Sequence, residues 1–296
     1  MRAACGRIVA RMPLATILVP THDHGPTLMH SLGSALSQTV DDFEIVVVGD
    51  GVPDVTRRLV AELTAQDARI RFLDCPKGEN RGEHHRHTAI LTALSPVVCY
   101  LADDDLWMPD HLETMLPLLE HADFATSVPL VVEPGGALDA APVHLGATFV
   151  RERLMAGTID VPLSCVGHTV AAYRDLPIGW APPPPGAGSG LTMWQRFFAR
   201  PATRADSSDR MTVLNFKSID REGVEPDRRA AELGHWAGRL AERDFQLELT
   251  QAALRSALTG WHRCEGEHHS AERHALHLEA QLTGARGLRG MLRRGR

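Results

Sequence analysis

The sequence of 296 residues lacks any run of about 18 consecutive apolar residues, so we expect no membrane-spanning helix. The apolar stretch within residues 1–12 is too short for a signal peptide. The five cysteines are scattered without a CxxC pair, which is typical of reduced thiols in a cytoplasmic protein. Positive charge is in the minority, with 31 Lys and Arg against 37 Asp and Glu, and the net charge of -6 argues against a nucleic-acid partner.

The composition that remains, 44% hydrophobic and 23% charged, is that of a globular protein with a substantial core. Short apolar runs predict buried strands over Ala15–Pro20, Glu44–Val48, Ile70–Leu73, Pro96–Leu101 and Phe124–Val132. Apolar residues at helical spacing predict helices over Pro26–Ser37, Asp54–Ala65, Arg86–Leu94 and His111–Glu120. Because continuous apolar strands alternate with helices, we expect an α/β fold with a mostly parallel sheet flanked by helices.

The second half of the chain is less regular. The segment Ala181–Gly190 is too rich in Pro and Gly for a helix or an inner strand, and we interpret it as a loop over the site or as a linker. From Pro226 apolar residues recur every seven positions and predict one long amphipathic helix, at Leu233, Leu240, Leu247, Leu254 and Trp261. A homo-oligomer through this helix is one expectation. The Arg-rich tail after residue 285 either touches an anionic membrane surface or is disordered.

Polar clusters follow three of the predicted strands. They are Thr21-His22-Asp23, Gly49-Asp50-Gly51 and Asp103-Asp104-Asp105. In a parallel α/β sheet the ligand binds at the carboxyl ends of the strands. The sequence therefore predicts a binding site at this edge of the sheet.

The acidic cluster Asp103–Asp105 carries the strongest chemical signal. Neighbouring carboxylates repel one another, so they require a cation, and a hard divalent ion such as Mn²⁺ or Mg²⁺ keeps coordination positions free for phosphate oxygens. The alternative is that these acids only begin the next helix, where its dipole favours them. Since one Asp would serve that purpose, we favour a site for a metal and a diphosphate.

Several motifs stand in an order that resembles the family 2 glycosyltransferases of the GT-A fold. They are ILVPTHDH, SLGSALSQTVDDFEIVVVGDG, NRGEHHRHTAI and YLADDDLWMPDHLE, and together they span Ala15–Val132. The resemblance implies a Rossmann-like GT-A sheet and a nucleotide-diphosphate-sugar donor.

The resemblance also implies roles for individual residues. The expected donor-binding residues are Pro20, Thr21, His22, Asp50, Arg86, Asp103 and Asp104. The first three would hold the base and ribose, Asp50 would read the base, and Arg86 would lie near the diphosphate. Asp103 and Asp105 would be the DxD metal ligands, with Asp105 favoured. Gly49 and His22 depart from the family pattern, which has an Asp and commonly a Tyr at these positions.

These implications give a domain layout and a function. We expect an N-terminal extension (1–14), a nucleotide-sugar-binding half (15–135), an acceptor-binding half (136–225) and a helical extension (226–296). The expected reaction is an inverting, metal-dependent transfer of a sugar to a glycan or small-molecule acceptor. A non-catalytic nucleotide-sugar- or carbohydrate-binding module remains an alternative. A sugar-phosphate nucleotidyltransferase is another, although VPTHDHGPT lacks the Gly-rich loop and Lys that it would need.

An inverting enzyme needs a general base on the acceptor side. The segment LSCVGHTVAAYRDLPIGW resembles the acceptor region of a family subgroup, and it nominates His168, whose alternative role is structural. Asp160 and Asp175 are the other candidates. Gly190 and Leu191 stand where the resemblance leads us to expect an Asp.

The histidine-rich patches and two tryptophans have competing interpretations. A zinc site is disfavoured because no set of four ligands has suitable spacing. We expect His84 and His87 to line the donor pocket instead. Trp180 and Trp194 would either stack on a sugar or belong to the core.

Overall fold

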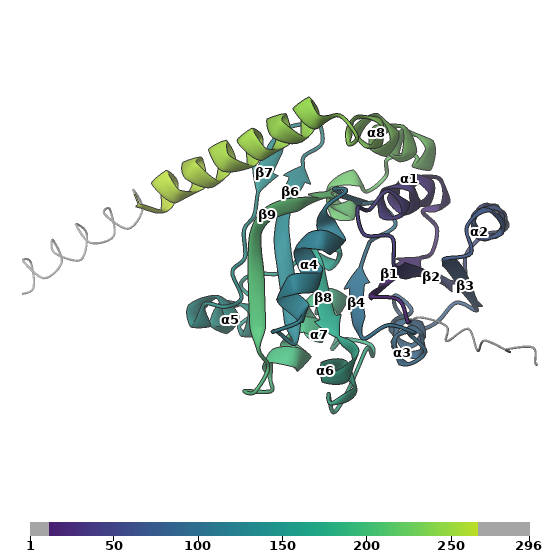
Figure 1. The fold of residues 1–296 in the computed structure, drawn as a ribbon, viewed down its shortest axis with the longest axis horizontal. Coiled ribbons are helices and arrows are strands. Elements are labelled where there is room, and N and C mark those ends of the chain that lie inside the picture. Colours follow the sequence, from purple (N-terminus) through teal and green to yellow (C-terminus); the bar gives the residue numbers. More distant parts are fainter. Residues whose placement is uncertain (1–11, 266–296) are drawn as a thin grey trace, which may run out of the picture. The chain divides into compact units, whose positions relative to one another are not determined.

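The computed structural model describes residues 12–265 and is drawn in Figure 1. The chain divides into two units, one ending at Ala253 and the other beginning at Leu254. The predicted extension 1–14 lies largely outside the described residues, and the Arg-rich tail lies wholly outside them. Within the described part, no helix combines the length and the apolar character needed to cross a membrane.

The first unit is built on one sheet. Its described strands are β1 (Ala15–Thr21), β2 (Phe43–Asp50), β3 (Ile70–Cys75), β4 (Val97–Tyr100), β5 (Leu106–Trp107), β6 (Phe124–Val132), β7 (Leu138–Ala140), β8 (Val166–Thr169) and β9 (Ala205–Asn215). They are ordered β3-β2-β1-β4-β8-β6-β9-β5, with β7 added to β6. The pairs among β1 to β4 are parallel. β8 lies antiparallel between β4 and β6, so strands from beyond residue 136 complete the sheet begun by the first half.

Helices flank this sheet (Figure 1). They are α1 (Gly25–Leu36), α2 (Asp54–Gln66), α3 (Glu83–Leu91), α4 (His111–Leu119), α5 (Thr148–Met155), α6 (Val170–Arg174), α7 (Ser189–Phe198) and α8 (Pro226–Arg239), with short 3₁₀ turns η1 (Leu163–Cys165) and η2 (Ser218–Arg221). Each strand and helix predicted between residues 15 and 132 is present within about three residues of its expected bounds. The α/β architecture expected from the sequence is confirmed.

A long C-terminal helix is present as predicted, but it does not run unbroken from Pro226. α8 ends at Arg239, a turn follows, and helical structure resumes at residue 243. Leu233 and Leu240 are buried against Leu130 and Phe216 in a second apolar cluster, whereas Leu247 and Trp261 are exposed. The first residues of the seven-residue repeat therefore pack in the core, and the later ones are exposed.

Candidate functional site

A cleft of about 470 Å³ lies at the carboxyl ends of β1, β2 and β4. We call it the first cleft. Every donor-binding residue expected from the sequence lines it, namely Pro20, Thr21, His22, Asp50, Arg86, Asp103 and Asp104. Their convergence follows from the parallel pairing of the strands, which brings the ends of the three strands to one edge.

Asp50 lines this cleft, and two hydrogen bonds hold its carboxylate in place. It accepts hydrogen bonds from the Gly78 amide at 2.6 Å and from Lys77 Nζ at 2.7 Å. Burial alone would raise the pKa of Asp50, but these hydrogen bonds outweigh it and lower the pKa below its ordinary value. Gly82 permits this geometry, because a Cβ there would come within 2.6 Å of Asp50 Cγ. His22 Nδ1 donates to the Asp50 carbonyl at 2.6 Å, so the two residues form one wall.

Arg86 supplies positive charge from α3. Its side chain is almost buried, its Nη2 donates to the Arg81 carbonyl at 2.8 Å, and its guanidinium lies 4.9 Å from the Trp180 ring. Among the described residues, no acceptor reaches its Nε. Desolvation lowers the pKa of Arg86. A buried guanidinium with spare donors is suited to a phosphate, which accepts charge-assisted hydrogen bonds in the same fork geometry.

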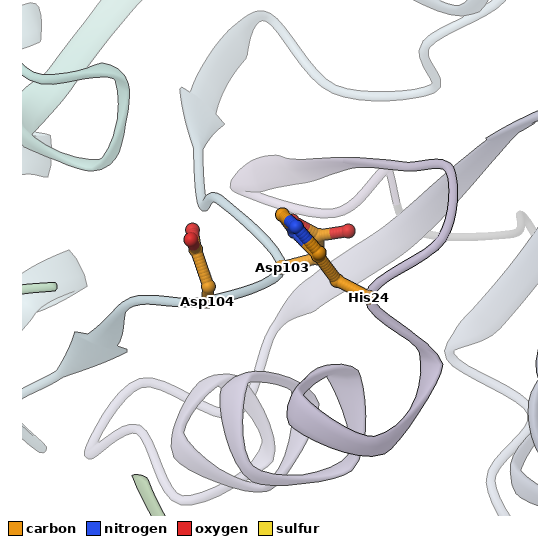
Figure 2. Close-up of side chains that lie close together, drawn as sticks. All are labelled: His24, Asp103 and Asp104. Carbon is orange, nitrogen blue, oxygen red and sulfur yellow. The ribbon is translucent and has the colours of Figure 1, made fainter. Parts of the chain in front are cut away.

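Three side chains in the first cleft could hold a metal ion (Figure 2). Asp103 and Asp104 follow β4, and His24 precedes α1; one ligand atom from each lies within 4.8 Å of the others. His24 Nδ1 is 3.1 Å from Asp103 Oδ1. Burial raises the pKa of Asp104, and the neighbouring Asp103 charge adds to the effect. Two carboxylates beside an open cleft fit Mn²⁺ or Mg²⁺, which prefer oxygen ligands and bind phosphate oxygens in the remaining positions.

Asp105 is not part of this group, although the sequence favoured it as the metal ligand. It is 2% exposed and accepts hydrogen bonds from the Ser164 hydroxyl at 2.5 Å, the Phe216 amide at 2.8 Å and the Asn215 amide at 3.1 Å. Desolvation raises the pKa of Asp105 to about 7. Since donors from η1 and β9 occupy both of its oxygens, the structure assigns Asp105 to joining these elements and pairs Asp103 with Asp104 instead.

His168 lies inside the sheet on β8 and does not line the first cleft. The residue is fully buried; its Nδ1 donates to the Thr169 carbonyl at 3.0 Å, so its Nε2 accepts from the Tyr100 hydroxyl at 2.6 Å. Desolvation lowers the pKa of His168 to about 4. A neutral ring with both nitrogens bonded and no path to an acceptor hydroxyl fits the structural role rather than that of a base.

A second cleft of about 830 Å³ adjoins the first. The residues that line both clefts are Arg81, Ala102, Asp104, Leu163 and Ser218. Asp160 also lines the second cleft, and partial desolvation raises the pKa of its carboxyl. Asp175, the other acidic candidate for the base, lines neither of these clefts and is 3.3 Å from Arg200 on the surface. Of the three candidates for the base, only Asp160 thus lines a cleft that it shares with Asp104 of the acidic cluster.

Some of the remaining predicted residues line the first cleft, and others do not. Trp180 lines the first cleft, whereas Trp194 is buried and donates to the Val161 carbonyl. His87 is bonded to the Tyr173 hydroxyl, and neither it nor His84 lines the first cleft, contrary to expectation. The end of the Pro- and Gly-rich segment reaches the cleft at Gly190, where an Asp was expected.

Sequence reasoning missed three residues at the acidic cluster. His24 belongs to one of the histidine-rich patches, which the sequence weighs only as a zinc site, and no motif marks Ser218 or Arg229, which both donate to Asp104 Oδ2. The His24 imidazole could have been found, because it directly follows the polar cluster Thr21-His22-Asp23 at the end of β1. Arg229 could not, because 125 residues separate it from Asp104.

Comparisons with known proteins point to one family. A model of the family described as "Glycosyl transferase family 2" matches residues 16–176, which is more than half of the chain. The uncharacterized glycosyltransferase EpsJ of Bacillus subtilis is 32% identical over 94 residues, covering 32% of this chain and 27% of EpsJ. The chain thus matches only about a quarter of this relative's length.

Solved structures share the fold. Staphylococcus aureus TarS (residues 1–349) in complex with UDP-GlcNAc has a TM-score of 0.57 at 17% identity, covering 77% of this chain and 66% of TarS. The mannosyltransferase PcManGT from Pyrobaculum calidifontis, in complex with GDP-Man and Mn²⁺, has a TM-score of 0.50 at 17% identity and covers 84% and 76% of the two chains. The expected GT-A fold is confirmed by this likeness.

Proposed function

The chain belongs to glycosyl transferase family 2, and we propose that it transfers a sugar from a nucleotide-diphosphate sugar to an acceptor hydroxyl. The observation that carries this proposal is the first cleft, which is lined both by a carboxylate held in place by hydrogen bonds, Asp50, and by charged groups suited to a diphosphate and a metal ion, Arg86 and Asp103–Asp104. The complexes of TarS with UDP-GlcNAc and of PcManGT with GDP-Man support a donor of this class.

Within this proposal the charged groups bind the two ends of the donor. His22 and Asp50 contact the nucleoside, while the free donors of Arg86 bind the diphosphate. A divalent cation held by Asp103, Asp104 and His24 would neutralise the charge that develops on the leaving diphosphate. Mn²⁺ in the PcManGT complex supports that choice of ion.

The acceptor belongs in the second cleft, and Asp160 is the proposed general base. As the acceptor oxygen bonds to the anomeric carbon, its proton passes to the Asp160 carboxylate and the bond from that carbon to the diphosphate oxygen breaks. A single displacement of this kind inverts the configuration at the anomeric carbon. The raised pKa of Asp160 suits it to accept the proton, and its presence in the cleft that shares Asp104 supports this role.

A second function rests on Gly190. This residue lines the first cleft without a side chain, at the position where the family resemblance places an acid. Under this alternative the chain binds a nucleotide sugar or carbohydrate without transferring the sugar.

One experiment separates the two functions. The full chain is incubated with UDP- and GDP-sugars and Mn²⁺, and release of the nucleotide diphosphate is measured with and without acceptors. We expect turnover in the wild type, a loss of about 10²-fold or more in Asp160→Asn, and unchanged turnover in the control Asp175→Asn, with donor affinity preserved in both.

The variant Gly190→Asp is used if the wild type shows no turnover. A Cβ at this position meets only Trp194, at 3.6 Å, so a carboxylate has room. If the wild type is inactive across the panel and this variant turns over, the chain is a binding module that lost its base. Turnover in the wild type that is insensitive to Asp160→Asn would refute the assignment of Asp160.

A further inference from the structure

Arg229 is a positive charge placed against the acidic cluster from outside the matched region. It lies on α8 and is 7% exposed. Its Nη2 donates to Asp104 Oδ2 at 2.6 Å, and its Nη1 lies 2.9 Å from His24 Nε2. Its Nε has no acceptor among the described residues. One guanidinium therefore bridges two of the three groups that could hold a metal ion.

The atoms that Arg229 contacts are those a metal would use. A carboxylate only accepts hydrogen bonds, so His24 Nδ1 carries the proton that it shares with Asp103, and Nε2 presents its lone pair to Arg229. An imidazole nitrogen coordinates a metal through that same lone pair. Asp104 Oδ2 is likewise engaged, since it accepts from both Arg229 and the Ser218 hydroxyl.

Electrostatics also indicate that the Arg229 guanidinium and a divalent cation would compete for the acidic cluster. Two buried carboxylates need a compensating charge, and without a metal the guanidinium provides it. A divalent cation placed on Asp104 and His24 would lie beside a fixed positive charge of the same sign. The two cations cannot both hold these ligands in this geometry.

We propose that Arg229 is the resident counter-cation of the acidic cluster, and that a divalent ion binds Asp104 and His24 by displacing its guanidinium. This inference rests on the metal site of the proposed function. It makes α8 a determinant of metal affinity, although α8 lies beyond the residues that the family model matches.

Packing contacts of α8 with its neighbours hold Arg229 next to the acidic cluster. Arg221 is bonded to both oxygens of Glu232, with the shorter contact at 2.6 Å, and Leu233 is fully buried. Gly234 lets the helix approach α1, because a Cβ there would come within 2.9 Å of the His30 ring. With the backbone of α8 fixed in this way, release of the guanidinium is a movement of one side chain.

The first test measures Mn²⁺ affinity of the full chain by electron paramagnetic resonance of free Mn²⁺, at constant pH. We expect Arg229→Ala and Arg229→Gln to bind Mn²⁺ about 10-fold or more tightly than the wild type, because a competing charge is removed. Arg228→Ala removes the same charge from an exposed neighbour on the same helix and should leave the affinity unchanged. Equal or weaker Mn²⁺ binding in both Arg229 variants would overturn the proposal.

The second test uses the wild type, so it does not depend on the folding of a variant. Phenylglyoxal modifies accessible arginines, and peptide mapping by mass spectrometry gives the extent at each position. Arg229 should be protected in metal-free protein and become reactive at saturating Mg²⁺, while Arg228 reacts equally in both states. Continued protection of Arg229 with Mg²⁺ bound, or no metal binding by any variant, would also overturn it.

The outcomes distinguish this inference from the proposed function. Sugar transfer by the wild type together with unchanged Mn²⁺ affinity in the Arg229 variants would refute only the displacement. Tighter Mn²⁺ binding in those variants, with no turnover of any donor, would refute only the transferase.

Discussion

Replacing His168 with phenylalanine tests whether this residue is structural. The variant keeps an aromatic ring in the stack with Tyr173, where the ring centroids are 5.3 Å apart, but it cannot be protonated. It also leaves the buried Tyr100 hydroxyl without its acceptor, which costs about 1–3 kcal/mol of unfolding free energy at every pH. The informative quantity is therefore how the unfolding free energy changes with pH.

The expected pH dependence follows from the pKa of His168. Burial lowers this pKa from 6.5 in the unfolded chain to about 4 in the folded state. Between these values the unfolded chain binds the proton and the folded protein does not, so stability falls as the pH falls. From pH 7.5 to pH 5.0 the loss attributable to His168 is about 2 kcal/mol, since each unit of pKa shift is worth about 1.4 kcal/mol at full titration.

The assay is urea unfolding of wild type and variant at both pH values. His111, whose pKa burial lowers to about 3, titrates in both proteins and cancels from the comparison. We expect the variant to lose about 2 kcal/mol less than the wild type on acidification. Equal losses would refute the buried neutral state of His168. A fall in turnover of about 10²-fold or more at pH 8, where both proteins are folded, would restore His168 as the base.

Three further predictions concern the cleft and the C-terminal unit. Arg86→Met should weaken nucleotide-diphosphate binding by about 10-fold or more in calorimetry, because the spare guanidinium donors are lost, and it should also cost about 1 kcal/mol of unfolding free energy through the lost hydrogen bond to the Arg81 carbonyl; unchanged affinity would remove Arg86 from the site. Asp104→Asn should abolish the Mn²⁺-dependent part of that binding, whereas Asp105→Asn should cost about 2 kcal/mol of unfolding free energy; the reverse pattern would restore Asp105 as the ligand. Deleting residues 254–296 should lower the oligomeric state in light scattering and spare nucleotide binding, and an unchanged state would refute the oligomer role.

The first half of the fold could be predicted because its strands are locally apolar and, apart from β3, buried along nearly their whole length. β2 is an example, with every residue from Phe43 to Asp50 buried. The strands of the second half carry no such signal. β8 spans four residues and includes His168, and the first half of β9 is polar and partly exposed. Pairing with β4 and β6 holds these strands in the sheet, and such long-range pairing leaves no periodicity in the local sequence.

The candidate site likewise contains residues that the sequence could predict and residues that it could not. The rule that ligands bind at strand ends placed Asp50 and Asp103 at one cleft, and the family resemblance added Arg86 from α3. It could not tell Asp104 from Asp105, because the turn after β4 sends adjacent side chains in different directions. One carboxylate meets His24 and Arg229, while the other meets donors from η1 and β9. Only the folded backbone decides between two identical neighbours.

Hydrogen bonds across the first cleft join residues beyond the matched region to carboxylates within it. Ser189 donates to Glu83 at 2.7 Å, and both Ser218 and Arg229 donate to Asp104. Three residues beyond the matched region are thus hydrogen-bonded to carboxylates of its first half, Glu83 and Asp104. Ser218 also lines the second cleft, so under the proposed function we expect a cation that binds Asp104 to alter hydrogen bonds in the second cleft as well. The proposed metal binding and the shape of the second cleft would then be coupled through one oxygen atom, Asp104 Oδ2.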